Sequence, residues 1–310
     1  MKISCFRELP SPSGIRVLKI TDPETDAVRA VLFSHGCHPV IAHISTKMVS
    51  ADYPGRAATE LRKQLGGEAL AMFCQGCGAD ANVETLNGTF DDVDRIGDYV
   101  AWCVRQAAER ARPIGGGCVT AKAKTVPMPT RIPALDEAQK TLKVNRAEYA
   151  RVLAQNPSPE LEAEFRELYI EWPEDLLNIA KQPDTDQRIR MDVSTLTFGD
   201  DFCLVGLEAE VFHRYQDICS ELSPCEQTVV FSFVGGSVSY LPTADEFERG
   251  GYETAGADYT DIYGYAYRRY GTLTFTPECE ATVREAVREM LRVEPRTGSY
   301  IEGCGHRPSA

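Results

Sequence analysis

The sequence has no long apolar run, no cluster of basic residues and only 5 histidines among its 310 residues. No apolar stretch approaches the roughly 20 residues that a membrane-spanning helix needs, so we expect no stable membrane insertion. The formal net charge is −13 and no Lys/Arg-rich run is present, so we expect no nucleic-acid groove and no contact with an anionic membrane. What remains is an ordinary globular composition, typical of proteins that act on small molecules.

Several familiar motifs are also missing. The sequence contains no Gly-x-Ser-x-Gly elbow, no phosphate-binding loop and no Gly-x-Gly-x-x-Gly turn. It shows no internal repeat, no low-complexity segment and no change of composition that would mark a linker. The length therefore predicts either two domains or one large domain, with a substantial core.

The cysteines and the N-terminal residues indicate the cellular compartment of the protein. Eleven cysteines, an odd number without regular spacing, predict reduced thiols rather than a disulfide framework. Residues 1–14 carry Arg7, Glu8 and two prolines where a signal peptide would need an apolar core. We therefore expect a cytoplasmic protein. Cys74 and Cys77 form a Cys-x-x-Cys pair, which we interpret as small buried thiols, with a redox dithiol or half of a zinc knuckle as the alternative.

Strands and helices alternate along the first third of the chain. The predicted elements are strands at 14–20, 27–34 and 69–73 and helices at 53–65 and 94–112. This alternation predicts a layered α/β architecture.

The rest of the chain continues the same pattern around a helical stretch. Further strands are predicted at 118–128, 193–198, 202–206 and 228–234, and helices at 212–222 and 278–292. Residues 134–180 are charged and helix-forming, with breaks at Pro157-Ser158-Pro159 and Trp172-Pro173. Residues 235–271 are rich in Gly and Tyr, which is typical of a functional loop. We expect one α/β domain over 1–310, a mixed β-sheet with flanking helices and a helical hairpin inserted at about 134–182.

Polar side chains gather where predicted strands end. His35 and His38 follow strand 27–34, the small-residue loop 74–82 follows strand 69–73, and Glu208 and Glu210 follow strand 202–206. Ligands usually bind at such strand ends in open α/β sheets, so these groups predict metal ligands or a base with its orienting partner. Two structural interpretations stay open: an imidazole that caps strand carbonyls, and a carboxylate in the first turn of the next helix.

Six segments in collinear order, spread between about residues 14 and 270, resemble the neutral/alkaline ceramidase family. Members of this family are zinc-dependent amidases that cleave the N-acyl bond of ceramide. The segments are AVLFSHGCHP at 30–39, SADYPG at 50–55, QGCGADAN at 75–82, LEAEVF at 207–212, GSVSYLPT at 236–243 and GGYE at 250–253. The resemblance implies the fold of the ceramidase catalytic domain and one Zn²⁺ ion.

The resemblance also implies a set of site residues. It places the zinc ligands at His38, Glu210 and Tyr240, and a second tyrosine over the reacting amide at Tyr252, which is 252 − 240 = 12 residues later. The implied reaction is metal-assisted amide hydrolysis. Zinc activates a bound water and polarises the carbonyl, while a phenol or an imidazole stabilises the oxyanion or protonates the departing nitrogen.

Three departures from the family pattern matter. The family has a His-Thr-His motif upstream of its Cys-His-Pro segment, which supplies a further ligand and a second catalytic imidazole, and this sequence lacks it. Asn82 stands where the family has a catalytic serine, and its amide can donate to an oxyanion but cannot act as a nucleophile. The immunoglobulin-like C-terminal domain of full ceramidases is not expected here. We predict that His35 replaces the missing histidine, as ligand and as catalytic group.

The main hypothesis is a cytoplasmic zinc amidohydrolase that acts on a small acyl-amide substrate other than ceramide. One alternative is a non-catalytic or half-site subunit that a partner chain or a second copy completes. Another is thiol chemistry by Cys37 or Cys77 with His35 or His38. The site could also be free of metal.

Overall fold

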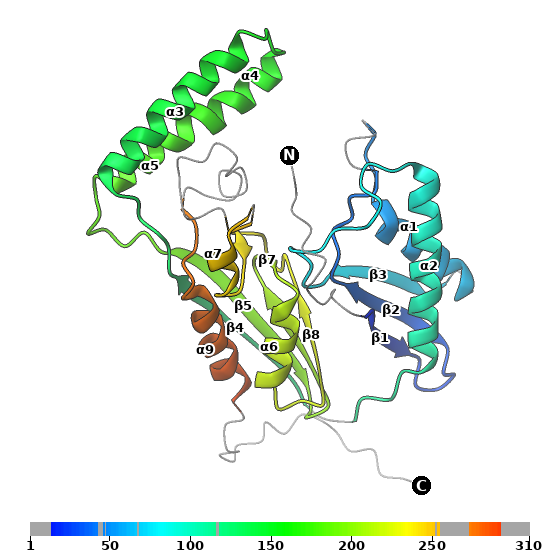
Figure 1. Ribbon diagram of the computed structural model, residues 1–310. Coiled ribbons are helices and arrows are strands. Elements are labelled where there is room, and N and C mark those ends of the chain that lie inside the picture. The colour runs from blue at the N-terminus through cyan, green and yellow to red at the C-terminus, as the bar shows by residue number, and fades with distance from the viewer. Residues whose placement is uncertain are drawn as a thin grey trace.

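The computed structural model describes residues 14–42, 46, 48–66, 68–115, 118–251, 253–254 and 273–292. Within these residues the chain forms sheets of three, four and two strands, covered by helices (Figure 1). The layered mixed α/β architecture expected from the sequence is confirmed. No helix in this part of the chain is both long enough and apolar enough to cross a membrane.

The first layer holds the N-terminal sheet. Its strands are β1 (Arg16–Thr21), β2 (Val28–His35) and β3 (Leu70–Gln75), with β1 antiparallel and β3 parallel to β2. Helices α1 (Asp52–Gln64) and α2 (Phe90–Glu109) pack against each other, and the core includes the buried Val31 and Phe33. Because β2 and β3 run in parallel, their carboxyl ends meet at the same edge.

Helix α2 begins four residues before the predicted residue 94. Thr89 accepts a hydrogen bond from the Asp92 backbone N–H, and the Asp92 carboxylate accepts one from the Thr89 backbone N–H. This reciprocal capping box satisfies backbone donors that an apolar-periodicity argument does not count.

The second layer holds the larger sheet, in the order β4–β5–β6–β8. Its strands are β4 (Val119–Met128), β5 (Ile189–Phe198), β6 (Phe202–Leu207) and β8 (Gln227–Phe231), and only the β6–β8 pair is parallel. Helices α6 (Arg214–Leu222) and α9 (Cys279–Leu291) pack on this sheet and on each other (Figure 1). Their buried side chains, such as Ile218 and Val283, complete its core.

A helical arm, inserted between β4 and β5, projects from the layer of the larger sheet (Figure 1). It consists of α3 (Leu135–Leu153), α4 (Pro159–Arg166), the π-helix η1 (Glu167–Glu171) and α5 (Trp172–Ala180). The predicted break at Pro157-Ser158-Pro159 is confirmed. The break predicted at Trp172-Pro173 is wrong, because the chain continues through a π-turn in which the Trp172 N–H donates to Glu167 O. The proline, which lacks an N–H, falls at the second position of α5 and is tolerated there.

A small sheet lies beyond the ends of the larger strands. Its two parallel strands are β7 (Glu210–Val211) and β9 (Tyr240–Leu241), and a short helix, α7 (Glu246–Arg249), follows. Strand β9 and helix α7 fall within the predicted functional loop 235–271. About half of that loop, including Tyr252, lies outside the described residues.

Candidate functional site

The loops that follow β2 and β3 interlock through glycines. A Cβ on Gly36 would lie 2.1 Å from Cys77 O, and one on Gly78 would lie 2.4 Å from Gly36 C. The loops approach this closely only because both residues lack side chains. The contact places His38 beside the second loop, where its N–H donates to Ala81 O at 2.9 Å and its backbone bridges to Asn82.

The same loops join the two layers. The backbone N–H of Ala79 donates to Val211 O at 3.0 Å, and that of Ser232 donates to Gln75 O at 2.9 Å. The Ser232 hydroxyl also donates to Gly76 O at 2.8 Å. Residues that follow strands of both sheets are thereby held at one edge.

Two side chains predicted as zinc ligands meet at this edge. His38 Nε2 lies 3.9 Å from Glu210 Oε2, and the two side chains are 20% and 4% exposed. Glu210 pairs in register with Tyr240 across the β7–β9 sheet, and its N–H donates to Ser239 O at 2.9 Å. The structure thus brings together His38, Glu210 and Tyr240 from three distant segments, with Asn82 beside His38.

The His38–Glu210 spacing is compatible with a shared zinc ion. Zn–N and Zn–O distances of about 2.0–2.2 Å in a tetrahedral site separate two ligand atoms by about 3.4 Å, somewhat less than the 3.9 Å observed. His38 Nε2 now donates to Ala79 O at 3.0 Å and would have to lose that proton to bind a metal. Within the described residues, no group of three His, Cys, Asp or Glu side chains could hold a metal ion. The Tyr240 phenol is the further donor that the resemblance implies.

Glu253 is a further carboxylate near the predicted ligands, and sequence reasoning did not single it out. Burial raises the pKa of its carboxyl group, the neighbouring Asp80 and Glu210 carboxylates add to that increase, and His38 opposes it. Glu253 therefore lies within electrostatic reach of the predicted ligands. The available signal was its place in the segment GGYE, where only the preceding tyrosine was assigned a role.

His35 occupies a different place from His38. It lines a cavity of about 290 Å³ whose lining includes neither His38 nor Glu210. Its ring packs edge-on against Tyr53, and its buried Nδ1 has no hydrogen-bond partner in the described part of the chain. Burial lowers the pKa of this imidazole. The role predicted for His35 as a ligand stays a prediction.

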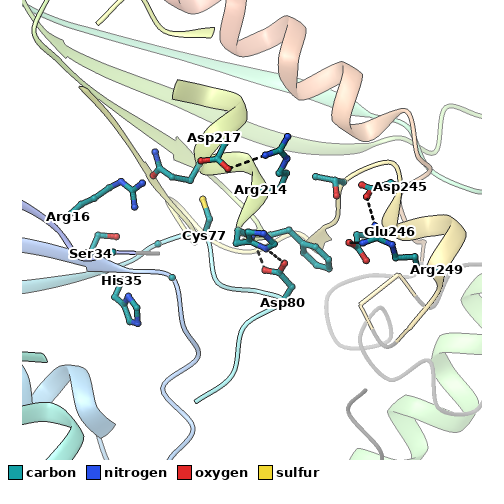
Figure 2. A pocket seen from close by; sticks show the side chains of 17 residues that line it. Arg16, Ser34, His35, Cys77, Asp80, Arg214, Asp217, Asp245, Glu246 and Arg249 are labelled. Atoms are coloured by element: carbon teal, nitrogen blue, oxygen red, sulfur yellow. Dashed lines mark hydrogen bonds and ion pairs between the residues drawn. The ribbon is translucent and has the colours of Figure 1, made fainter. Parts of the chain in front are cut away.

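The cavity also contains a pair that no motif indicated, Asp80 and His213. Figure 2 labels Asp80 at the edge of this cavity. The His213 backbone N–H donates to Asp80 Oδ1 at 2.8 Å, and its Nδ1 forms a short hydrogen bond with Asp80 Oδ2. This side-chain bond raises the pKa of His213. The two residues are 133 positions apart, so sequence spacing offers no sign of their pairing.

The thiols near the site are not activated. Burial, with the Asp52 carboxylate as a second cause, raises the pKa of the Cys37 thiol to about 11. Burial also raises the pKa of Cys77 well above its usual value. Both environments disfavour the thiolate that the thiol hypothesis requires.

Known proteins with this fold include neutral ceramidases. No family model and no curated protein matches the sequence. Among solved structures, neutral ceramidase from Pseudomonas aeruginosa superposes with a TM-score of 0.58 at 17% identity, covering 90% of this chain and 47% of its own. A structure described as ceramidase complexed with C2 superposes with a TM-score of 0.59 at 14% identity, covering 94% of this chain and 50% of its own. The resemblance seen in the sequence is confirmed at the level of the fold, and the chain spans about half the length of the ceramidases it matches.

Proposed function

We propose that this chain is a zinc-dependent amidohydrolase that cleaves a linear N-acyl amide other than ceramide. One observation carries the proposal: His38 and Glu210, which the resemblance identifies as zinc ligands, meet at 3.9 Å beside Tyr240. The shared fold supports it. The residues come from separate strand ends, and their convergence is a contact of the fold that no single sequence motif contains.

In this proposal His38, Glu210 and Tyr240 would hold the zinc ion. When bound, zinc supplies Lewis acidity and lowers the pKa of a bound water. Asn82 is exposed and bridges His38 through its backbone, so its side-chain amide can donate a hydrogen bond to the oxygen that becomes negative as the amide is attacked. The roles of Tyr252 and His35 rest on the resemblance alone.

The substrate is proposed to differ from ceramide for two reasons. Asn82 replaces the family's serine, which changes the hydrogen bonds available to the reacting carbonyl. The formal charge of −13 also disfavours approach to an anionic membrane in which a lipid substrate resides. A small acyl-amide in the cytoplasm fits both features, and the nine cysteines in the described residues are all free thiols, as that compartment requires.

Elemental analysis joined to an amine-release assay tests the proposal. We expect about one zinc per chain in wild-type protein, loss of the metal in the double variant His38→Ala/Glu210→Ala, and amine release from at least one compound in a panel of linear N-acyl amides. His35→Ala is the matched imidazole variant, and its zinc content tests the predicted replacement ligand. Protein from metal-replete medium that holds no zinc, or zinc that survives the double variant, contradicts the proposal.

A half-site protein is the second candidate. It is favoured by the described residues, in which no group of three His, Cys, Asp or Glu side chains could hold a metal. In that case a partner chain or a second copy would supply the remaining ligand. A monomer by light scattering with stoichiometric zinc argues against it.

A further inference from the structure

The Asp80–His213 pair has no part in the function proposed above. Asp80 follows β3 in the first layer, and His213 follows β7 beside the second layer, so each layer contributes one partner. Both side chains are 18% exposed and line the cavity of about 290 Å³ (Figure 2). A volume of this size admits a small molecule or one end of a larger one.

Asp80 holds His213 at two points. One carboxylate oxygen accepts the backbone N–H of His213, and the other accepts the Nδ1–H of its ring. These bonds fix the ring orientation and the tautomer, which leaves the lone pair on Nε2. Nε2 has no hydrogen-bond partner among the residues that the structure describes. An imidazole that a carboxylate orients through one nitrogen, with its second nitrogen open, is the arrangement of a general base.

The cavity adjoins the predicted zinc ligands. Asp80 is the residue after Ala79, whose carbonyl accepts the hydrogen bond of His38 Nε2. His213 lies three residues after Glu210. Glu253 responds electrostatically to Asp80 as well as to His38 and Glu210. The dyad and the predicted metal ligands therefore lie on the same two chain segments, although the lining of the cavity includes neither His38 nor Glu210.

We infer that His213, oriented by Asp80, is the imidazole that transfers the proton during amide cleavage, with the scissile amide reaching into this cavity. The inference rests on the proposed function and names a catalytic residue for it. Neither the sequence motifs nor the resemblance assigned a role to His213.

The proton transfer balances without any further reactant except water. His213 Nε2 accepts a proton from water as the water oxygen bonds to the carbonyl carbon. The protonated ring then donates that proton to the amide nitrogen as the C–N bond breaks. The products are a carboxylic acid and an amine, and His213 is neutral again.

His35 lines the same cavity but is less suited to this role. Its Nδ1 has no hydrogen-bond partner in the described chain, and the hydrogen bond that influences its pKa is to the Gly14 backbone and not to a carboxylate. Burial is the main influence on its pKa and disfavours the imidazolium that must form in the middle of the reaction. The sequence predicted a catalytic role for His35, but the structure favours His213 for that role.

The test compares His213→Gln and Asp80→Asn with wild type in the amine-release assay between pH 5 and 9. Loss of a general base lowers kcat/KM by about 10²–10⁴-fold, which we expect for His213→Gln. Asp80→Asn should lower kcat/KM by at least about 10-fold and move the acid limb of the pH profile to lower pH, because the variant removes the main cause of the raised pKa of His213. Asp217 and Glu246 also face His213 and should keep part of that increase. Asp186→Asn, an exposed aspartate outside the cavity that pairs with Arg188, is the control and should match wild type.

Two further readouts separate catalysis from folding. Zinc content should stay near wild type in Asp80→Asn, as should thermal unfolding at pH 9, where the stabilisation from protonated His213 is smallest. Added imidazole should restore part of the activity of His213→Ala. Wild-type rates and an unshifted pH profile in His213→Gln and Asp80→Asn, while His38→Ala is inactive, overturn the inference and leave the proposed function standing. If wild type itself releases no amine, the proposed function fails and the inference fails with it.

Discussion

Two pairs of histidine and carboxylate connect the two layers, and in each pair the sheets contribute opposite partners. In the first pair the imidazole, His38, follows the first sheet and the carboxylate, Glu210, follows the second. In the other pair the carboxylate, Asp80, follows the first sheet and the imidazole, His213, follows the second. His38 and Glu210 are 3.9 Å apart without a hydrogen bond between them, whereas Asp80 and His213 are bonded directly.

The difference in spacing separates two kinds of chemistry. An open pair of nitrogen and oxygen donors leaves room for an ion between them, since ligands of one zinc ion are held apart by about 3.4 Å. A directly bonded pair such as Asp80 and His213 has no such room, but its hydrogen bond fixes the orientation of the imidazole for proton transfer. Residues of the same types can therefore take different roles because the backbone sets their separation.

The largest expected effect comes from a substitution in the loop contact that positions both histidine–carboxylate pairs. Gly36→Ala would place a Cβ 2.1 Å from Cys77 O, in the contact between the loops that carry His38 and Asp80. We expect the free energy of unfolding to fall by about 3 kcal/mol, at the upper end of overpacking costs. Urea unfolding measures it. In the control, Gly236→Ala, the nearest atom is the flexible Glu208 side chain at 3.1 Å. Equal stability of the two variants contradicts the interlocked-loop interpretation.

The next effect distinguishes the pairs by metal affinity. Glu210→Gln should lower zinc affinity by more than about 100-fold, because loss of outer partners of ligands alone costs about 10–100-fold. Asp80→Asn should change it by less than about 10-fold, because Asp80 is engaged with His213. Competition with a chromogenic chelator measures both. Similar losses in the two variants would mean that the pairs act as one metal site.

The smallest effect is a pH dependence of the free energy of unfolding that arises from the directly bonded Asp80–His213 pair. The hydrogen bond to Asp80 raises the pKa of folded His213 above its ordinary value of 6.5. The resulting stabilisation is fully present below about pH 6.5 and is lost as the pH rises through the folded pKa. The difference in the free energy of unfolding between wild type and Asp80→Asn should therefore be greater at pH 5.5 than at pH 9. If the difference in the free energy of unfolding between wild type and Asp80→Asn does not vary with pH, the hydrogen bond to Asp80 does not raise the pKa of His213.

Much of the fold could be predicted because its signals are local. Apolar periodicity identified the strands β1 to β3 and the helix α1 to within a few residues. The misses have local physical causes as well. The capping box starts α2 early, and the π-turn carries the arm through Pro173. Neither device changes the apolar pattern on which the predictions depended.

The candidate site was predictable only in part. Strand ends in a layered sheet indicated His38 and Glu210, and the resemblance added Tyr240. The pairing of Asp80 with His213 and the nearness of Glu253 could not be predicted. Both are contacts between chain segments far apart in sequence, and no spacing rule describes such contacts.

The sequence by itself determined the class of architecture and the pieces of the site, because periodicity and residue type act over a few neighbouring positions. Only the tertiary structure decided which histidine meets which carboxylate and how closely. That decision depends on the approach of two backbones at Gly36 and Gly78, which holds one imidazole near a carboxylate and binds another directly to its partner. The scarcity of histidines therefore matters less than the placement of these two.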